Sequence, residues 1–275
     1  MILQGDCHDC ISKLPHNSVQ SLVTSPPYWG LRDYDEKGQL GQEDTPEEFI
    51  SKLVNLFARG RDALKDDGTM WINIGDTYFG AKGGAWESDN SITTEDTGSE
   101  YRMKRKAPPK HRYLKVKDLV GIPWKFAIAM QEDGWYLRQD IIWHKPVPMP
   151  EAVNDRFQKS HEHIFLFSKK PKYYFNAEAV GIPKKHEEGW VRRHDVWEMP
   201  TSNYQGAHFA VFPQKLPELC IKASTKEGDT VLDPFMGSGT TAYVAQQLGR
   251  KWIGIELNPE YIKIIKQRTS QQTLF

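Results

Sequence analysis

Residues 18–29 read SVQSLVTSPPYW, a short apolar run followed at once by two prolines and two aromatic residues. Val19, Leu22 and Val23 are β-branched or apolar, as is typical of a buried parallel strand. The prolines end this strand, because proline lacks the N–H that a ladder needs and keeps the preceding residue extended. We therefore expect Ser25 at the carboxyl end of a strand, where open α/β sheets bind their ligands.

Ser25, Pro26 and Tyr28 have the chemistry to activate an amino group on an aromatic ring. The lone pair of such an amine is delocalised into the ring, so the nitrogen is a poor nucleophile. The Ser25 hydroxyl and the Pro26 carbonyl could accept hydrogen bonds from its two N–H groups and favour a pyramidal nitrogen that attacks a methyl sulfonium directly, the mirror image of an oxyanion hole. The Tyr28 ring would stack on a base taken out of a duplex. A strand-ending proline turn with a packing tyrosine is the alternative interpretation.

A second motif, at residues 230–241, reads TVLDPFMGSGTT. It combines an apolar strand, the acid Asp233, a loop of small residues and a helix start; such loops and helix starts bring backbone N–H groups to a ligand. The strand WIGIE at 252–256 ends in Glu256, about 20 residues after the loop, which suits an acceptor for ribose hydroxyls. The loop lacks both GxGxxG and the lysine of a phosphate-binding loop, so a nucleoside cofactor without phosphates fits best and a nicotinamide-dependent oxidoreductase fits poorly.

These two motifs resemble those of the DNA amino-methyltransferases, which read S/D/N-P-P-Y/F and D-P-F-x-G-S-G-T-T. The resemblance implies S-adenosylmethionine as cofactor, double-stranded DNA as substrate, and Ser25, Pro26, Pro27 and Tyr28 as the catalytic residues. It also implies an α/β, Rossmann-like methyltransferase fold of three layers with a mixed seven-stranded sheet. The catalytic motif precedes the cofactor motif, which in this family marks a circular permutation: the chain begins at the third strand of the sheet and ends after the second.

The resemblance also assigns residues to the cofactor pocket. Asp6, at the end of an expected N-terminal strand, would lie near the adenine amino group, and Phe209 with Phe212 or Pro213 would line the methionine end. The cofactor-binding residues that we expect are Asp6, Thr24, Phe209, Phe212, Pro213, Asp233, Pro234, Phe235, Gly237, Ser238, Gly239, Thr240 and Glu256.

A third set of residues is expected to contact DNA. Strands at 136–146 and 161–168 should form a hairpin with one antiparallel strand, and the resemblance places a W-x-K segment of this hairpin at the flipped base. A core tryptophan and a surface lysine are the alternative for Trp143 and Lys145. The stretch 101–117 carries eight basic residues and no acid, so it could neutralise phosphates; a solvated loop is the alternative. The expected contacts to the base and to DNA are Trp29, Trp143, Lys145, Arg102, Lys104, Arg105, Lys106 and Arg112.

The chain divides into one catalytic domain and two insertions. We expect residues 1–79, 117–175 and 206–275 to form the methyltransferase domain, and residues 80–116 and 176–205, which lack regular periodicity, to form insertions that recognise DNA.

Local signals predict several further elements. Thr45 begins a capping box with proline at the first helical position, and Asn258 should cap the last helix. A strand is expected over Thr69–Asp76, where Asn73 and Asp76 could touch cofactor or base. A further helix should start near Asp118.

Composition excludes several classes of protein. Basic and acidic residues number 36 each, so the chain is not a uniformly basic DNA binder, and 39% hydrophobic content is typical of a globular protein. No apolar run reaches the roughly 18–20 residues of a membrane span and no signal peptide is evident, so we expect a cytoplasmic protein. The spacing of Cys7 and Cys10 lacks a second ligand pair, and His161 and His163 lack further ligands, so no metal is expected.

Serine at position 25 favours N4 of cytosine over N6 of adenine as the acceptor, by resemblance. Methylation of adenine, of RNA or of a protein amide remains an alternative, as does a DNA-binding regulator without catalysis. A companion restriction endonuclease is compatible with this interpretation, and the oligomeric state stays open.

Overall fold

The computed structural model describes residues 1–30, 38–80, 110–201 and 212–270. Several predicted site residues lie outside these ranges, namely Phe209, Arg102, Lys104, Arg105 and Lys106.

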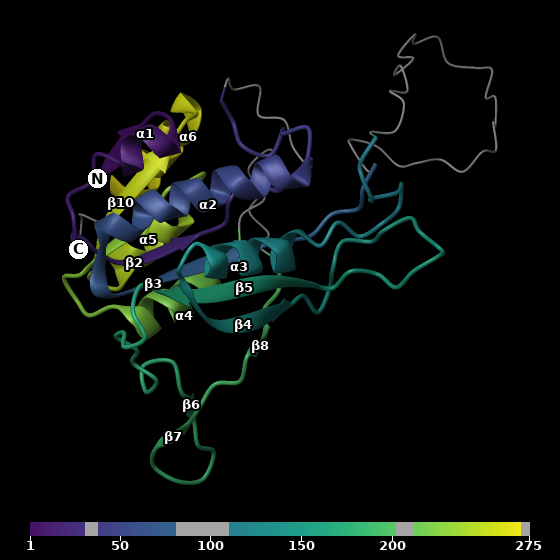
Figure 1. The fold of residues 1–275 in the computed structure, drawn as a ribbon. Coiled ribbons are helices and arrows are strands. Elements are labelled where there is room, and N and C mark those ends of the chain that lie inside the picture. The colour runs from purple at the N-terminus through teal and green to yellow at the C-terminus, as the bar shows by residue number, and fades with distance from the viewer. Residues whose placement is uncertain (31–37, 81–109, 202–211, 271–275) are drawn as a thin grey trace.

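An eight-stranded sheet forms the centre of the structure (Figure 1), in the order β1-β10-β9-β2-β3-β5-β4-β8. β5 is antiparallel to both of its neighbours and every other pair is parallel, as the predicted hairpin requires. The strands in sheet order are β1 (Ile2–Gln4), β10 (Lys251–Glu256), β9 (Thr230–Asp233), β2 (Val19–Thr24), β3 (Leu64–Ile74), β5 (His161–Ser168), β4 (Tyr136–His144) and β8 (Val196–Glu198).

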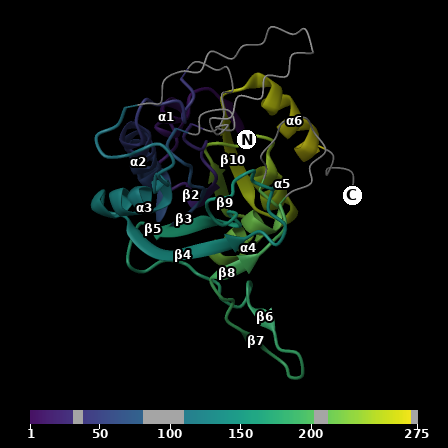
Figure 2. The same ribbon diagram turned by 90° about the vertical axis from the view of Figure 1, so that its right-hand side faces the viewer.

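The eighth strand corrects the predicted count of seven. β8 comes from the region 176–205, where the sequence shows no periodicity, and it pairs with the edge strand β4. Its Trp197 is buried and lies 6.5 Å from the ring of Trp71. A strand of three residues with one inward side chain is too short to show a pattern. The same region also forms the small hairpin of β6 (Ile182–Pro183) and β7 (Trp190–Val191), which projects from the body in Figure 2.

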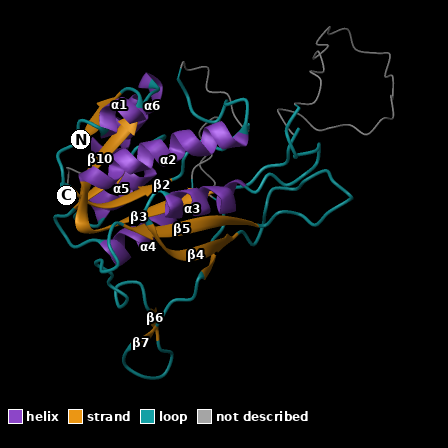
Figure 3. Cartoon of the chain, viewed as in Figure 1, coloured by secondary structure: helices purple, strands orange, loops and turns teal. Residues whose placement is uncertain are grey.

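Helices cover both faces of the sheet, which gives the predicted three layers (Figure 3). Alternate strand residues point to opposite faces. Leu22 and Met70 share one core cluster with α1 (Cys7–Ile11), α2 (Pro46–Ala63) and α3 (Ile122–Glu132). Val23 and Trp71 share the other with α4 (Lys215–Ser224) and α5 (Thr240–Gln247), and α6 (Pro259–Ser270) packs against α5.

The strand order confirms the predicted permutation. β2, near the start of the chain, pairs directly with β9, near its end, through Ser21 with Val231 and Leu22 with Leu232. The chain leaves β9 toward β10 on one side and β2 toward β3 on the other. The carboxyl ends of β2 and β9 therefore flank a topological switch point, where sheets of this type bind ligands.

The predicted helix caps are confirmed at two ends. The Thr45 side chain accepts a hydrogen bond from Glu48 N at 3.2 Å, and Asn258 Oδ1 accepts one from Glu260 N at 2.8 Å. Among the described residues, no helix is long and apolar enough to cross a membrane, and no group of side chains could hold a metal ion.

The predicted starts of one helix and one strand are wrong. α3 begins at Ile122 and not near Asp118, because Gly121 adopts a φ of +81° before it and Asp76 accepts hydrogen bonds from Gly121 N and Ile122 N at 3.0 Å. β3 begins at Leu64 and not at Thr69, because residues 65–68 bulge out of an otherwise continuous pairing with β2.

Candidate active site

Asp233 joins the two sequence motifs. Thr24, the last residue of β2, donates its hydroxyl to this carboxylate, which also accepts from Thr241 Oγ1 at 2.7 Å and from Phe235 N at 3.0 Å. Asp233 is 2% exposed, and burial raises its pKa to about 6 although these donors oppose the shift. The carboxylate therefore fixes the end of β2 against the loop that follows β9.

The loop after β9 is shaped by its glycines. Gly237 and Gly239 have φ values of +52° and +83°, which side chains rarely adopt. A Cβ on Gly239 would lie 3.0 Å from Ile265, so the loop packs tightly on α6 there, whereas a Cβ on Gly237 would come no nearer than 3.9 Å to any neighbouring atom. The backbone at Gly237 thus lies open to a ligand. Pro234 is buried and Phe235 is half-buried beside it.

Arg268 of α6 fixes this loop by hydrogen bonds to Ser238. Its guanidinium donates to Ser238 O at 2.7 Å and to Ser238 Oγ at 3.0 Å, and Ser238 and Thr240 are both buried. Ser238 and Thr240, which were predicted to bind the cofactor, are thus bound by Arg268. No local signal in the sequence could reveal Arg268, because it lies in the last helix, far from the motif.

Glu256 and Asp6 lie side by side at the same edge. β1 and β10 pair in parallel, and Gly5 N donates to Glu256 O at 3.0 Å. The Glu256 carboxylate accepts from Gly237 N at 2.7 Å and from Asn258 N at 2.9 Å, and burial raises its pKa to about 7. Asp6 caps α1 by accepting from His8 N at 2.8 Å. The carboxyl edge therefore presents two acids beside the open loop.

The catalytic motif lies at the end of β2, on the other side of Asp233. Ser25 and Pro27 are half-buried and Pro26 is buried. The Tyr28 ring lies against the backbone of β3, since a Cβ on Gly75 would be 2.7 Å from its Cε2 atom. The Tyr28 hydroxyl donates to Glu162 of β5.

Glu162 is a residue of the site that was not predicted from the sequence. It is 8% exposed and accepts hydrogen bonds from Tyr28, from the Lys145 ammonium and from Asn73 Nδ2, the last at 3.1 Å. An acid at a buried position of a strand was the available signal, because carboxylates are seldom buried without partners. Lys145, which was predicted near the base, and Asn73, which could touch cofactor or base, both bind this carboxylate and through it contact the catalytic motif.

Two tryptophans predicted to contact the base are instead buried. Trp29 is 4% exposed, stacks on Phe79 and donates to Glu43 O at 2.9 Å. Trp143 is 4% exposed and donates to Met199 O at 2.8 Å, with the Lys145 ammonium 4.6 Å from its ring centre. Both side chains pack within the protein in this structure, and their contact with a base stays a prediction. Periodicity cannot separate a tryptophan that packs from one that stacks on a ligand.

The described end of the basic stretch is anchored to α2. Tyr113 Oη donates to Glu47 Oε1 at 2.8 Å, and His111 Nε2 lies 3.0 Å from Glu47 Oε2. Arg112 between them is exposed, with its guanidinium 5.5 Å from the Tyr113 ring. Of the residues predicted to contact phosphates, Arg112 is the one that the structure describes. Its backbone is anchored on both sides by His111 and Tyr113, which bind Glu47.

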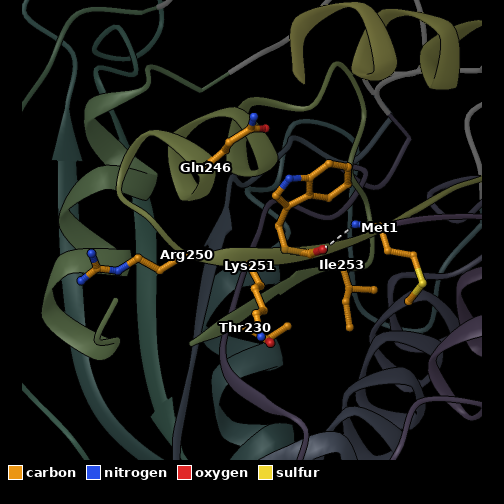
Figure 4. Close-up of a pocket in the computed structure, with 7 residues that line it drawn as sticks. Met1, Thr230, Gln246, Arg250, Lys251 and Ile253 are labelled. Atoms are coloured by element: carbon orange, nitrogen blue, oxygen red, sulfur yellow. Dashed lines mark hydrogen bonds between the residues drawn. The ribbon is translucent and has the colours of Figure 1, made fainter. Parts of the chain in front are cut away.

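A separate hollow lies at the opposite edge of the sheet (Figure 4). It is lined by Thr230 and Lys251, the first residues of β9 and β10, and by Met1, whose ammonium donates to Trp252 O at 2.8 Å. Because both motifs lie at the carboxyl ends of the strands, this hollow is not part of the candidate active site.

Comparison with known proteins agrees with this geometry. A family model described as DNA methylase matches residues 19–267. The type II methyltransferase M.Cfr9I of Citrobacter freundii is 47% identical over 267 residues, which cover 97% of this chain and 86% of the relative. M.SmaI of Serratia marcescens is 47% identical over 268 residues, which cover 97% of this chain and 89% of the relative.

Solved structures show the same fold. The PvuII DNA methyltransferase (cytosine-N4-specific) superposes with a TM-score of 0.73 at 23% identity and covers 100% of this chain and 87% of that one. M1.HpyAVI in complex with SAM superposes with a TM-score of 0.59 at 22% identity, over 98% of each chain. From the match over most of its length and from its relatives at 47% identity, the chain belongs to the N6/N4 family of DNA methylases.

Proposed function

We propose that the protein transfers a methyl group from S-adenosylmethionine to the exocyclic N4 amine of cytosine at a specific site in double-stranded DNA. The observation that carries this proposal is the meeting of the two motifs. The Ser25-Pro26-Pro27-Tyr28 tip and the loop after Asp233 leave adjacent strands at one edge, and the bond from Thr24 to Asp233 ties them together.

The residues at this edge fit S-adenosylmethionine, which contains adenosine and methionine but no phosphate. The carboxylates of Glu256 and Asp6 offer acceptors for ribose hydroxyls and for an adenine amino group, and the backbone at Gly237 is open to approach. Half-buried Phe212 and Pro213 precede α4 and would line the methionine end, as proposed also for Phe209. When bound, the cofactor supplies an electrophilic methyl group on a sulfonium. A solved neighbour crystallised with SAM supports this choice.

The tip supplies the acceptors that the amine needs. The Ser25 hydroxyl and the Pro26 carbonyl would accept the two N–H groups and localise the nitrogen lone pair for direct attack on the methyl group. Ser25 is half-buried, so solvent reaches the region into which the amine releases its proton after transfer. The Tyr28 ring, held by Gly75 and Glu162, would stack on the extruded base.

Cytosine N4 is preferred to adenine N6 for two reasons. Serine occupies the first position of the tip. The PvuII neighbour is named as cytosine-N4-specific. We propose residues 80–116 and 176–205 as the DNA-recognition insertions, the second of which carries the projecting hairpin of β6 and β7. The type II relatives support a companion endonuclease that cuts the same site.

The test is to incubate the purified protein with mixed duplex DNA and methyl-labelled S-adenosylmethionine, digest the DNA to nucleosides and identify the labelled one. Label in N4-methylcytosine is the expected result. Label in N6-methyladenine would replace the proposed base. Absence of label, with cofactor binding intact, would overturn DNA as the acceptor and lead to RNA or protein.

A further inference from the structure

The loop between β4 and β5, residues 145–160, leaves the sheet beside the catalytic tip. β5 is antiparallel to both β3 and β4, so β4 runs in the same direction as β3 and β2 and ends at the carboxyl edge. Figure 1 shows the loop extending beyond β4 and β5 on that side. Its first residue, Lys145, binds Glu162, which also binds Tyr28. One buried carboxylate, that of Glu162, thus binds both the loop, through Lys145, and the catalytic motif, through Tyr28.

Four large apolar side chains of this loop are exposed to solvent. Val147 is 79% exposed, Met149 85%, Phe157 98% and Val153 36%. A single exposed apolar residue is ordinary, but four in one loop next to a substrate site indicate a contact with a partner.

Hydrogen bonds within the loop join the two backbone segments that carry these side chains. Lys145 N donates to Ser160 O at 2.7 Å and closes the loop at its base. Gln158 Nε2 donates to Met149 O at 2.9 Å, which joins the arm that carries Met149 to the arm that carries Phe157. Lys159 Nζ donates to Asp76 O at 2.6 Å and fixes the loop to the end of β3.

The three cations of the loop all have partners within the protein. Lys145 pairs with Glu162, Arg156 pairs with Glu151, and Lys159 Nζ donates to Asp76 O at 2.6 Å. Phosphate recognition needs exposed positive charge. The exposed apolar side chains of the loop suit the uncharged faces of stacked bases better than the DNA backbone.

We propose that Met149 and Phe157 form an apolar wedge that enters the duplex beside the target base and fills the space that the extruded base leaves. This inference rests on the proposed function. Extrusion costs the stacking contacts of the target base with its neighbours, and apolar side chains inserted at a base step restore part of that contact. The wedge makes no hydrogen bonds to base edges, so it lowers the cost of extrusion without reading the sequence.

The test compares the double variant Met149→Ala/Phe157→Ala with wild type and with Ile128→Ala, which removes a 54%-exposed apolar side chain from α3. Single-turnover methylation is measured on a matched duplex and on the same duplex with a mismatch opposite the target, which makes extrusion easier. The double variant should lose about tenfold in rate or more on the matched duplex. Most of the rate should return on the mismatched duplex, and Ile128→Ala should leave both rates unchanged.

Fluorescence of pyrrolocytosine at the target position, which pairs with guanine as cytosine does, reports extrusion directly; the signal of extrusion should fall in the double variant, with affinity for S-adenosylmethionine unchanged. An equal loss on both duplexes, or no loss, would overturn the wedge while wild-type activity still supports the proposed function. A change in sedimentation from dimer to monomer, with equal losses on both duplexes, would assign the patch to a second copy instead. A wild-type protein that methylates no DNA would remove the proposed function and the wedge together.

Discussion

The carboxylate of Glu162 organises the catalytic tip. It is buried, yet it receives hydrogen bonds from Tyr28, Asn73 and Lys145, so its charge is satisfied by three donors from three different elements. A network of this kind is rigid only while every member is present. The position of the Tyr28 ring therefore depends on its hydroxyl as well as on packing.

Tyr28→Phe tests this dependence. The ring remains, but Glu162 loses one donor, so the free energy of unfolding should fall by about 1–3 kcal/mol. Turnover should fall less than in Tyr28→Ala, which also removes the stacking face. Thermal unfolding and single-turnover rates measure the two effects, and an unchanged melting temperature in Tyr28→Phe would show that the hydroxyl bond adds no stability.

Gly75→Ala tests the other support of the same ring. The new Cβ would lie 2.7 Å from Tyr28 Cε2, so the ring must shift. Because displacements of about 1 Å near a reacting group can cost about 100-fold in rate, turnover should fall by about 10- to 100-fold. Affinity for S-adenosylmethionine, measured by calorimetry, should stay unchanged. Gly60→Ala is the control, since its Cβ would meet only the ends of the Ile11 and Leu22 side chains, at 3.1 and 3.6 Å.

The affinity for S-adenosylmethionine should depend on pH through Glu256. Burial raises its pKa to about 7, so the carboxyl is protonated below that pH and ionised above it. The ionised form accepts hydroxyl hydrogen bonds more strongly, so binding favours it and affinity should rise from pH 6 to 8. Kd should fall by at most about tenfold per pH unit below pH 7 and then level off. Glu256→Gln should give a flatter profile; the same slope in that variant would point to another group.

At the level of single elements, α3 shows how a distant residue sets a helix start. Its first N–H groups bind the Asp76 carboxylate, which lies at the end of β3. Asp76→Ala should lower the free energy of unfolding by about 0.5–2 kcal/mol, the usual cost of losing a cap. Asp76→Asn keeps an acceptor without the charge and should cost less. Urea unfolding measures both, and equal losses in the two variants would mean that charge, and not the acceptor, stabilises the helix.

Elements with strong local signals were predictable from the sequence. β2, the hairpin of β4 and β5 and the capped start of α2 all follow from periodicity, proline and capping residues. The start of α3 was not predictable, because the residue that caps it, Asp76, follows a different element, β3. β8 was not predictable either, because a strand of three residues is too short to show an alternating pattern. In the site, the motif residues were predictable, whereas Glu162 and Arg268 act through contacts between segments far apart in the chain.

For the whole molecule, net charge and local charge have different consequences. The chain carries 36 basic and 36 acidic residues, so any electrostatic attraction to DNA must come from local clusters. Replacing Arg102, Lys104, Arg105 and Lys106 by glutamine should reduce the slope of log affinity against log salt by about 0.9 for each phosphate that these side chains neutralise. Fluorescence anisotropy at several salt concentrations measures the slope. An unchanged slope would mean that other residues bind the phosphates.

The pairing of β1 with β10 also affects how the protein is made. β1 ends at Gln4 and its partner β10 ends at Glu256, so β1 waits for the synthesis of 256 − 4 = 252 further residues before it can pair. At about 5–20 residues per second, that delay is on the order of 10–50 s. β2 likewise waits for β9, and until β9 arrives one edge of β2 has no partner from this sheet. Nascent chains of this fold therefore pass through a stage with open strand edges, at which chaperone binding or misassembly would act.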